Sequence, residues 1–437
     1  MFTPRSCLQR LILVRLGQLA AKEPCYLVGG AVRDVLAGRM GADLDFAFPA
    51  DPTPIARQLA ETLGGHWFFL DEERRQSRVV IRDGEKGDMT CDLSPFRSDS
   101  LFEDLKLRDF TINAMAFPLG EDGSLGVLYD PLSGREDLQK KLLRICSPSV
   151  LQDDPLRVLK GIRHCLTHGL AIESNTLHAM RAASSLLSQV APERIRDELF
   201  GILSAGSVER GIRLMQELKI LTLLLGSSPV GKDYRQGIKL IRQAETWLAA
   251  LDCNPQAPRA RELAKAKIES DIGRDLVLKL GALLKGYGTK DSASVLDRLR
   301  CSRRLQDTGR AFQELSGQLF GEFLSLRCGR RGRALWLAAL GPDPVACLLF
   351  LAVLGGGEGI HKIDAVEQGC EDLHACLVEG RIPDLVDGQW LQRHVGLEQG
   401  PEVGRALAAL RHEEIAGRVN NRQEAELFLQ SFREKNR

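Results

Sequence analysis

The sequence predicts an α+β protein, with a small mixed β-sheet and helices in its N-terminal part and an all-helical remainder. Up to about residue 130, strand-like and helix-like segments alternate. Beyond about residue 135, apolar residues recur three and four positions apart, which is the spacing of amphipathic helices. Apolar residues make up 44% of the chain and charged residues 27%, as in ordinary globular proteins.

The expected strands are short β-rich runs bounded by glycine, proline or charged residues. A helix is expected over Ile55–Leu63, where apolar side chains have helical spacing. The predicted strands are Tyr26–Val28, Asp43–Phe48, His66–Leu70, Arg78–Ile81 and Met89–Leu93.

Two apolar segments are expected to be helices of a globular protein and not membrane spans. Cys7–Leu19 is interrupted by two arginines and predicts an amphipathic helix rather than a signal peptide. Val345–Leu354 is too short to cross a bilayer, so we expect no membrane association. The eleven cysteines are odd in number and form no CxxC pair, which favours reduced thiols and a cytoplasmic location over zinc or disulfides.

The segment LVGGAVRDVLAGRMGADLDFAF carries most of the chemical information. Asp43 and Asp45 are two residues apart on a predicted strand, so both carboxylates point to one face. Gly29 and Gly30 let backbone N–H groups approach phosphate oxygens, and Arg33 can reach the same phosphates from the following helix. Solvated acids on a surface strand are the alternative, but the combination favours a site for a metal-bound nucleotide.

Two further segments add candidate ligands. Asp92, in TCDLSPFR, is either a solvated strand acid or a third carboxylate on a neighbouring strand. Three acids suit two-metal phosphoryl transfer, in which a pair of Mg²⁺ ions binds the nucleotide phosphates. In LKLRDFTINAMAF, Arg108 can contact phosphate or sugar, and Asn113 can contact backbone or ribose. Asp109 can instead fix Arg108 or a helix end, so structural roles remain open for it and for Asn113.

The segment LQDDPLRVLKGIRH suggests a base-reading pair. We expect Asp154 and Arg157 to lie three residues apart on one helix face, with Pro155 in the first turn. A carboxylate accepting from an exocyclic amine and a guanidinium donating to the adjacent ring nitrogen would suit cytosine and adenine. Guanine and uracil would leave both side chains mismatched, at about 1–3 kcal/mol each. The alternative is an exposed ion pair.

Taken together, these motifs resemble class II tRNA nucleotidyltransferases and bacterial poly(A) polymerases. The resemblance covers residues 25 to about 200 densely, and the C-terminal part is similar too. The matching segments, in order, are LVGGAVRD…DLD, TCDLSPFR, RDFTINAMA, DPLSGREDL, DDPLRVLKGIR and PERIRDEL.

The resemblance implies a nucleotidyltransferase head over residues 1–135, a helical neck over 136–205, a body over 206–330 and a tRNA-binding tail over 331–437. It implies two Mg²⁺ ions held by Asp43 and Asp45, CTP and ATP as substrates, and the 3′ end of tRNA as acceptor. The positions that match the family's catalytic or nucleotide-contacting residues are Asp92, Gly30, Arg33, Arg108, Asp154, Arg157 and Arg163, with Lys160 where the family has arginine.

Several alternatives stay open within this family. The basic signature that usually follows the DxD motif in poly(A) polymerases is absent, which favours tRNA 3′-end synthesis. Addition of CCA, of CC or of A alone shares every motif above, and a flexible loop, for which Leu70–Ser77 is the candidate, is implicated in that discrimination. A tRNA-binding protein with a decayed head is disfavoured because all three acids are present. The sequence does not indicate an oligomeric state.

RNA contact is expected from local basic clusters, because the net charge of +1 gives no overall attraction to nucleic acid. Solvated helix ends explain each cluster about as well. The candidate arginines are Arg300, Arg303, Arg304, Arg327, Arg330, Arg331 and Arg333.

Overall fold

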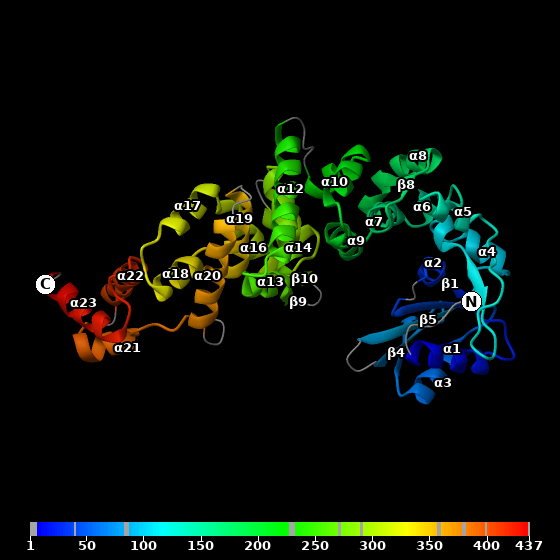
Figure 1. Ribbon diagram of the computed structural model, residues 1–437, viewed down its shortest axis with the longest axis horizontal. Helices are drawn as coiled ribbons and strands as arrows, with labels where there is room; N and C mark the ends of the chain where they lie inside the picture. Colours follow the sequence, from blue (N-terminus) through cyan, green and yellow to red (C-terminus); the bar gives the residue numbers. More distant parts are fainter. Residues whose placement is uncertain are drawn as a thin grey trace. The chain divides into compact units, whose positions relative to one another are not determined.

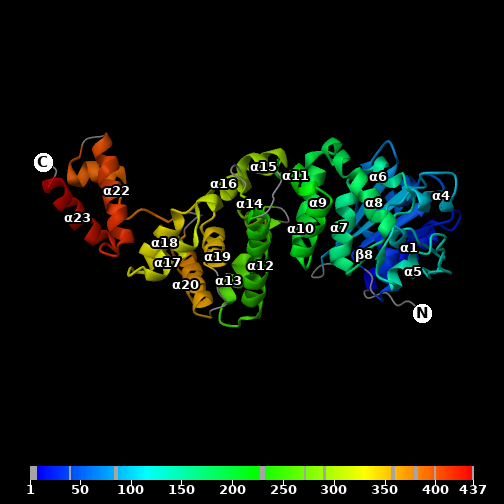
Figure 2. The same cartoon turned by 90° about the horizontal axis from the view of Figure 1, so that it is seen from above.

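The computed structural model describes residues 7–38, 41–82, 87–226, 232–269, 272–288, 292–355, 360–377, 382–397 and 400–435. The chain divides into two compact units, Met1–Val190 and Ala191–Arg437. The first unit contains a six-stranded sheet and short helices, whereas helices dominate the second (Figures 1 and 2). The predicted α+β fold is therefore confirmed.

The sheet of the first unit has the strand order β3-β4-β5-β2-β1-β6. Strands β2 and β5 are parallel neighbours, and the other neighbouring strands are antiparallel. All five predicted strands are present, with one addition, β6, paired to β1. The strands are β1 (Tyr26–Val28), β2 (Asp43–Phe48), β3 (His66–Asp71), β4 (Gln76–Arg82), β5 (Asp88–Pro95) and β6 (Ala116–Pro118).

One face of this sheet is closed by α1 and α3 (Figure 1). Alternate residues of the strands, among them Leu44, Phe46 and Cys91, pack there against Ile12 of α1 and Leu59 of α3. The predicted helices Cys7–Leu19 and Ile55–Leu63 are thus confirmed. Because side chains of a strand alternate between faces, the residues between these apolar ones lie on the opposite face.

The helices of the first unit are short. They are α1 (Cys7–Leu19), α2 (Gly30–Leu36), α3 (Thr53–Leu63), α4 (Leu101–Lys106), η2 (Thr111–Asn113), α5 (Gly134–Gln139), α6 (Val150–Asp153), α7 (Arg157–His168), α8 (Ser174–Ala183) and η3 (Ser184–Gln189).

Within the second unit, α12 and α14 lie side by side (Figure 2), and α19 is buried along most of its length, as expected for Val345–Leu354. In the described ranges, no helix has both the length and the apolarity needed to cross a membrane. The helices are α9 (Pro192–Ser204), α10 (Val208–Glu217), α11 (Ile220–Leu225), α12 (Lys232–Cys253), α13 (Pro258–Lys265), α14 (Arg274–Gly286), α15 (Ser292–Arg298), α16 (Arg303–Glu314), α17 (Gly317–Ser325), α18 (Arg330–Ala338), α19 (Pro344–Leu354), α20 (Ile360–Cys376), α21 (Gly388–Trp390), η4 (Leu391–Val395), α22 (Pro401–Ile415) and α23 (Arg422–Lys435).

Two expectations from the sequence are corrected. Strands do occur beyond residue 135, as two minimal pairs whose strands are too short to give a periodic signal: β7 (Leu142–Leu143) with β8 (Ala171–Ile172), and β9 (Lys267–Glu269) with β10 (Ile272–Gly273). In addition, Leu70–Ser77 is not a free loop. It is the tip of the β3–β4 hairpin, in which only residues 72–75 lie between the two strands.

Candidate active site

Three carboxylates lie on the face of the sheet that α1 and α3 do not cover, here called the open face. Strands β2 and β5 run parallel, with Asp45 directly opposite Asp92 and Asp43 opposite Thr90. The Thr90 hydroxyl donates a hydrogen bond to the Asp43 carboxylate. Leu44 and Cys91, which alternate with these acids along β2 and β5, pack into the core. The acids therefore lie on the face turned away from α1 and α3. The predicted neighbourhood of the three acids is therefore present.

The turn between β1 and α2 brings the backbone against these acids. Gly29 has φ 69°, a left-handed conformation that favours glycine. A Cβ at Gly29 would lie 2.7 Å from Oδ2 of Asp45 and 3.4 Å from Nη1 of Arg108. A Cβ at Gly30 would lie 3.2 Å from Nη2 of Arg33. The glycine turn, one acid and two arginines predicted to bind nucleotide are thus close neighbours.

The Asp45 carboxylate is electrostatically strained. Burial raises its pKa above the usual range, and the negative charges of Asp92 and Asp43 raise it further, whereas Arg108 and Lys160 lower it. Burial is the largest of these effects, and Arg108 opposes it more strongly than Asp92 adds to it. A bound cation would therefore stabilise the charged form of this desolvated carboxylate.

The donors present suit Mg²⁺. Asp43 and Asp45 are hard oxygen ligands on one strand face, and Mg²⁺ commonly binds through one or two carboxylates together with substrate phosphates. Within the part of the chain that the structure describes, no three His, Cys, Asp or Glu side chains are already grouped as ligands of one ion. The Asp92 carboxylate forms an ion pair with a residue of the neighbouring strand.

That partner is Arg78 on β4, which the sequence analysis placed on a strand but did not connect with the acids. Nε of Arg78 lies 2.6 Å from Oδ1 of Asp92, and Nη2 lies 2.7 Å from Oδ2. The hydrogen bonds to Asp92 raise the pKa of Arg78 above its usual value. No local sequence signal reveals this pair, because it depends on the register between β4 and β5.

A chain of polar contacts connects α2 to α7 through η2. Nη1 of Arg33 donates to Oδ1 of Asn113 at 2.6 Å, and Nδ2 of Asn113 donates to Oδ1 of Asp109 at 3.0 Å. Nζ of Lys160 on α7 lies 2.7 Å from Oδ2 of Asp109. Burial alone would raise the pKa of Asp109, but the charge of Lys160 and the hydrogen bonds from Lys160 and Asn113 hold it well below the usual range. Lys160, predicted to contact nucleotide, is here paired within the protein.

His164, which the sequence analysis did not single out, lies at the end of this chain of contacts. Its Nε2 is 3.3 Å from Nδ2 of Asn113, and its ring packs edge-on against Phe110 and stacks with His168. Burial lowers the pKa of His164 to about 3, although Asp109 partly opposes the shift. The imidazole is therefore neutral at physiological pH.

Arg108 is held by an acid other than the one considered from the sequence. Its Nη2 lies 3.2 Å from Oδ2 of Asp104, a buried carboxylate whose Oδ1 accepts a hydrogen bond from the backbone N–H of Arg97. Asp109, the alternative partner, binds Asn113 and Lys160 instead. Asp104 therefore fixes Arg108 beside Gly29.

The expected base-reading pair does not lie on a single helix. α7 begins at Arg157, whereas Asp154 precedes it with extended backbone angles, φ −145° and ψ 95°. The reason is Pro155, because proline disfavours helical conformation in the residue before it. The two residues still flank one turn, in which the Arg157 N–H donates to the Asp154 carbonyl at 3.1 Å. Nη1 of Arg157 donates to the carbonyl of Val150 at 3.1 Å, and Arg163 lies half-buried further along α7.

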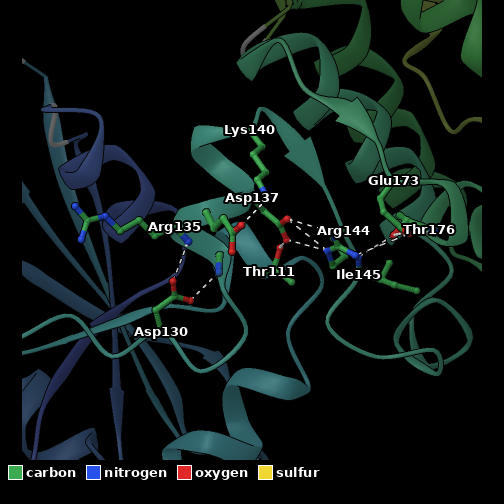
Figure 3. Close-up of polar contacts among 11 residues, drawn as sticks. Thr111, Asp130, Arg135, Asp137, Lys140, Arg144, Ile145, Glu173 and Thr176 are labelled. Carbon is green, nitrogen blue, oxygen red and sulfur yellow. Dashed lines mark hydrogen bonds and ion pairs between the residues drawn. The ribbon is translucent and has the colours of Figure 1, made fainter.

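The buried carboxylate of Asp137 connects α5 to η2, the short helix that contains Asn113 (Figure 3). Oδ2 of Asp137 accepts from the Thr111 hydroxyl at 2.7 Å and from Nε of Arg144 at 3.1 Å. Arg144 also lies 3.9 Å from Glu173, which caps α8 by accepting from the Thr176 N–H at 2.7 Å. These contacts connect η2, α5 and α8 within the first unit.

The arginines predicted to bind RNA, all in the second unit, fall into two groups. Arg331 and Arg333 lie 3.1 Å and 2.6 Å from the buried carboxylates of Glu414 and Asp372, and Arg304 lies 3.5 Å from buried Asp343. These contacts favour structural roles. The side chains of the other group are exposed, as is that of Arg304, and one of them, Arg330, also lies 3.5 Å from Asp372. This group comprises Arg300, Arg303, Arg327 and Arg330.

Two families match parts of the chain. Residues 25–144 match the family described as the poly A polymerase head domain. Residues 169–229 match the family described as a probable RNA and SrmB-binding site of polymerase A.

The chain is also similar to curated proteins and solved structures over nearly its whole length. It is 31% identical to a CC-adding tRNA nucleotidyltransferase of Geobacter sulfurreducens, over 92% of this chain and 91% of that protein. It is 31% identical to an A-adding tRNA nucleotidyltransferase of Deinococcus radiodurans, over 93% of this chain and 95% of that protein. The structure of a Thermotoga maritima CCA-adding enzyme complexed with tRNA superimposes with a TM-score of 0.67 at 23% identity, covering 98% of this chain and 97% of that one. With this similarity along its length, the chain belongs to the family of tRNA nucleotidyltransferases and poly(A) polymerases.

Proposed function

We propose that the protein is a template-independent nucleotidyltransferase that adds C, A or both from CTP and ATP to the 3′ end of tRNA. Family membership and the names of the relatives support the reaction class. The observation that carries the proposal is the alignment of Asp45 opposite Asp92 on parallel strands, with Asp43 on the same face and the Gly29 turn against Asp45.

In the proposed reaction, the terminal hydroxyl oxygen of the RNA forms a bond to the α-phosphorus of the nucleotide. The bond from that phosphorus to the bridging oxygen breaks, and pyrophosphate leaves. Asp43 and Asp45 would hold Mg²⁺, which when bound neutralises phosphate charge and makes the attacking hydroxyl more acidic. The backbone at Gly29 and the guanidinium groups of Arg33 and Arg108 would bind the triphosphate.

Base selection is proposed for Asp154 and Arg157. The carboxylate would accept from the exocyclic amine of cytosine or adenine, and the guanidinium would donate to the adjacent ring nitrogen. Their position at the two ends of one turn beside α7 supports this role. In this role the Arg157 guanidinium would donate a hydrogen bond to the base while its Nη1 also donates to the carbonyl of Val150.

The division into a head, a neck, a body and a tail over the ranges given above is part of the same proposal. The helical remainder would follow the tRNA, with exposed Arg303 and Arg330 among the phosphate contacts. A cytoplasmic location is proposed because tRNA processing occurs in that compartment.

The proposed activity is tested with three tRNA transcripts, lacking CCA, CA or only the final A, each incubated with CTP and ATP. Incorporation into at least one of them, with CTP or ATP but not GTP or UTP, is expected, and the pattern identifies which nucleotides are added. Long A tracts on an unrelated RNA would instead assign the protein to the poly(A) branch. Absence of incorporation into all of these RNAs would contradict the proposal.

A further inference from the structure

On β4, the strand next to β5, an arginine lies beside the acids of the open face. Strand β4 pairs with β5 so that Arg78 lies opposite Asp92, and β5 pairs with β2 so that Asp92 lies opposite Asp45. Val79 and Ile81, on either side of Val80 in β4, pack into the core, so Arg78 projects onto the same face as the acids. One line across three strands therefore holds an arginine and two carboxylates.

Arg78 and Asp92 form a bidentate ion pair. The separations are 2.6 Å and 2.7 Å, each between a different nitrogen and a different oxygen. Such a pair fixes the plane of a carboxylate as well as its position. Each carboxylate oxygen retains a second lone pair for another partner, so this contact does not exclude a further ligand of Asp92.

We propose that Arg78 is a positioning residue of the active site, which acts only through Asp92. It holds the third carboxylate beside Asp45 and balances part of its charge, so that three acids can share one face. It does not itself bind nucleotide or RNA. This inference rests on the proposed nucleotidyltransferase function.

The geometry explains why an arginine occupies this position. Asp92 is adjacent to Asp45, and like charges on neighbouring strands repel each other. Arg78, on the opposite side of Asp92 from Asp45, offsets part of this repulsion and fixes the orientation of the Asp92 carboxylate. A lysine would supply the charge but not the fork that sets the orientation of the carboxylate.

The kinetic test compares Arg78→Lys, Arg78→Ala, Asp92→Asn and the double variant Arg78→Ala with Asp92→Asn. Both Arg78 variants are expected to lower kcat by about 10- to 100-fold, as for other groups that orient metal ligands, with KM for CTP and tRNA near the wild-type values. The double variant is expected to be no slower than Asp92→Asn alone. Losses that multiply in the double variant, or a raised KM, would show that Arg78 contacts substrate and would overturn the proposal.

A second measurement does not depend on turnover. Binding of Mn²⁺ to the nucleotide-free protein is followed by electron paramagnetic resonance for the wild type and for Arg78→Lys, which has the same net charge. Weaker binding by the variant, by about 10- to 100-fold, is expected because only the orientation of Asp92 differs. Equal binding by the two proteins would overturn the proposal.

Arg82→Lys is the matched control, because Arg82 lies at the exposed end of the same strand, opposite Asp88. It is expected to retain wild-type kinetics and Mn²⁺ binding. If the wild-type protein labels no tRNA, the proposed function is refuted, and the Mn²⁺ affinities of the wild type and Arg78→Lys still test the role of Arg78. If the wild-type protein labels tRNA but the losses of kcat multiply in the double variant, only the role of Arg78 is refuted.

Discussion

The buried position of Asp45, which is proposed to bind the metal, makes its charged carboxylate costly to the stability of the folded protein. Burial and the neighbouring charges of Asp92 and Asp43 raise its pKa in the folded protein. The metal-free folded state therefore binds the Asp45 proton more tightly than the unfolded chain does. Its contribution to the free energy of unfolding falls as pH rises from the ordinary aspartate pKa through the raised one. Above that pH range the charged form of this buried carboxylate lowers the stability of the metal-free protein.

Asp45→Asn is consequently expected to raise the melting temperature at pH 7 in the presence of EDTA, while nucleotide incorporation is lost. Asparagine preserves the volume of the side chain and removes the charge that repels Asp43 and Asp92. Thermal denaturation followed by circular dichroism measures the change. A lower melting temperature for the variant in EDTA would contradict this account of the charge balance.

Gly29→Ala is expected to abolish most activity, because the new Cβ would lie 2.7 Å from the Asp45 carboxylate. The backbone of Gly29, with φ 69° and ψ −145°, adds a separate cost of roughly 1–3 kcal/mol in stability for any residue with a side chain. Gly38→Ala separates the two effects: Gly38 has φ 71° and a Cβ there would meet nothing within 4 Å. Both variants should lose stability in urea titrations because both positions have positive φ, and only Gly29→Ala should lose incorporation. Equal activity of the two variants would count against the close approach of Gly29 to Asp45.

At the scale of elements, the strands were predictable because each has a compact β-rich sequence bounded by turn residues. β6 was missed because it begins only at the last residue of the RDFTINAMA motif and its three residues are too few to show alternation. The boundary of α7 was misplaced because helical spacing from Asp154 to Arg157 outweighed the restriction that Pro155 imposes on Asp154. Sequence patterns specify local conformation well and exact helix ends poorly.

Pairings between elements were less accessible from the sequence. The convergence of Asp45 and Asp92 could be anticipated because both follow apolar strand residues. The pairing of Arg78 with Asp92 and of Lys160 with Asp109 could not, because each depends on strand register or helix packing that the sequence does not encode locally. His164 ends the segment LQDDPLRVLKGIRH but gave no signal of its own, and only its burial in α7 against Asn113 of η2 identifies it.

The packing of α7 against η2 predicts a pH dependence of stability. His164 has a folded pKa of about 3, whereas an unfolded histidine has a pKa near 6.5. As pH falls below 6.5, the unfolded chain gains a proton that the folded protein does not, so stability decreases until the folded pKa is reached. The contribution amounts to roughly 2 kcal/mol of lost stability between pH 7 and pH 5.

His164→Gln should therefore show a flatter decline of unfolding free energy between pH 7 and pH 5 than the wild type. His178→Gln, at an exposed position of α8, is the control and should reproduce the wild-type slope. Urea titrations at a series of pH values provide the measurement. A wild-type slope in His164→Gln would show that the buried imidazole does not set this dependence.

At the scale of the whole molecule, two classes of arginine are expected to behave differently toward tRNA. Arg303→Ala should weaken tRNA binding and reduce the slope of log affinity against log salt by about 1, because one phosphate contact is lost. Arg333→Ala should leave that slope unchanged. Filter binding at several salt concentrations measures both, and an unchanged slope for Arg303→Ala would remove this residue from the proposed RNA surface.

Arg333→Ala should instead destabilise the second unit by about 3 kcal/mol, because it removes a close partner from the buried Asp372 carboxylate. Denaturant unfolding of the full chain measures this loss. A stability equal to that of the wild type would show that the remaining neighbours of Asp372 suffice and that Arg333 is available for another role.

The carboxylates gathered on β2 and β5 are proposed to perform nucleotide transfer. The direct test is incorporation of labelled CMP or AMP into tRNA lacking its 3′ end by the variant Asp43→Ala with Asp45→Ala, with Asp88→Ala as a control from the exposed start of β5. We expect no incorporation by the double variant, a retained circular dichroism spectrum and an active control. Incorporation by the double variant at the wild-type rate would contradict this proposal.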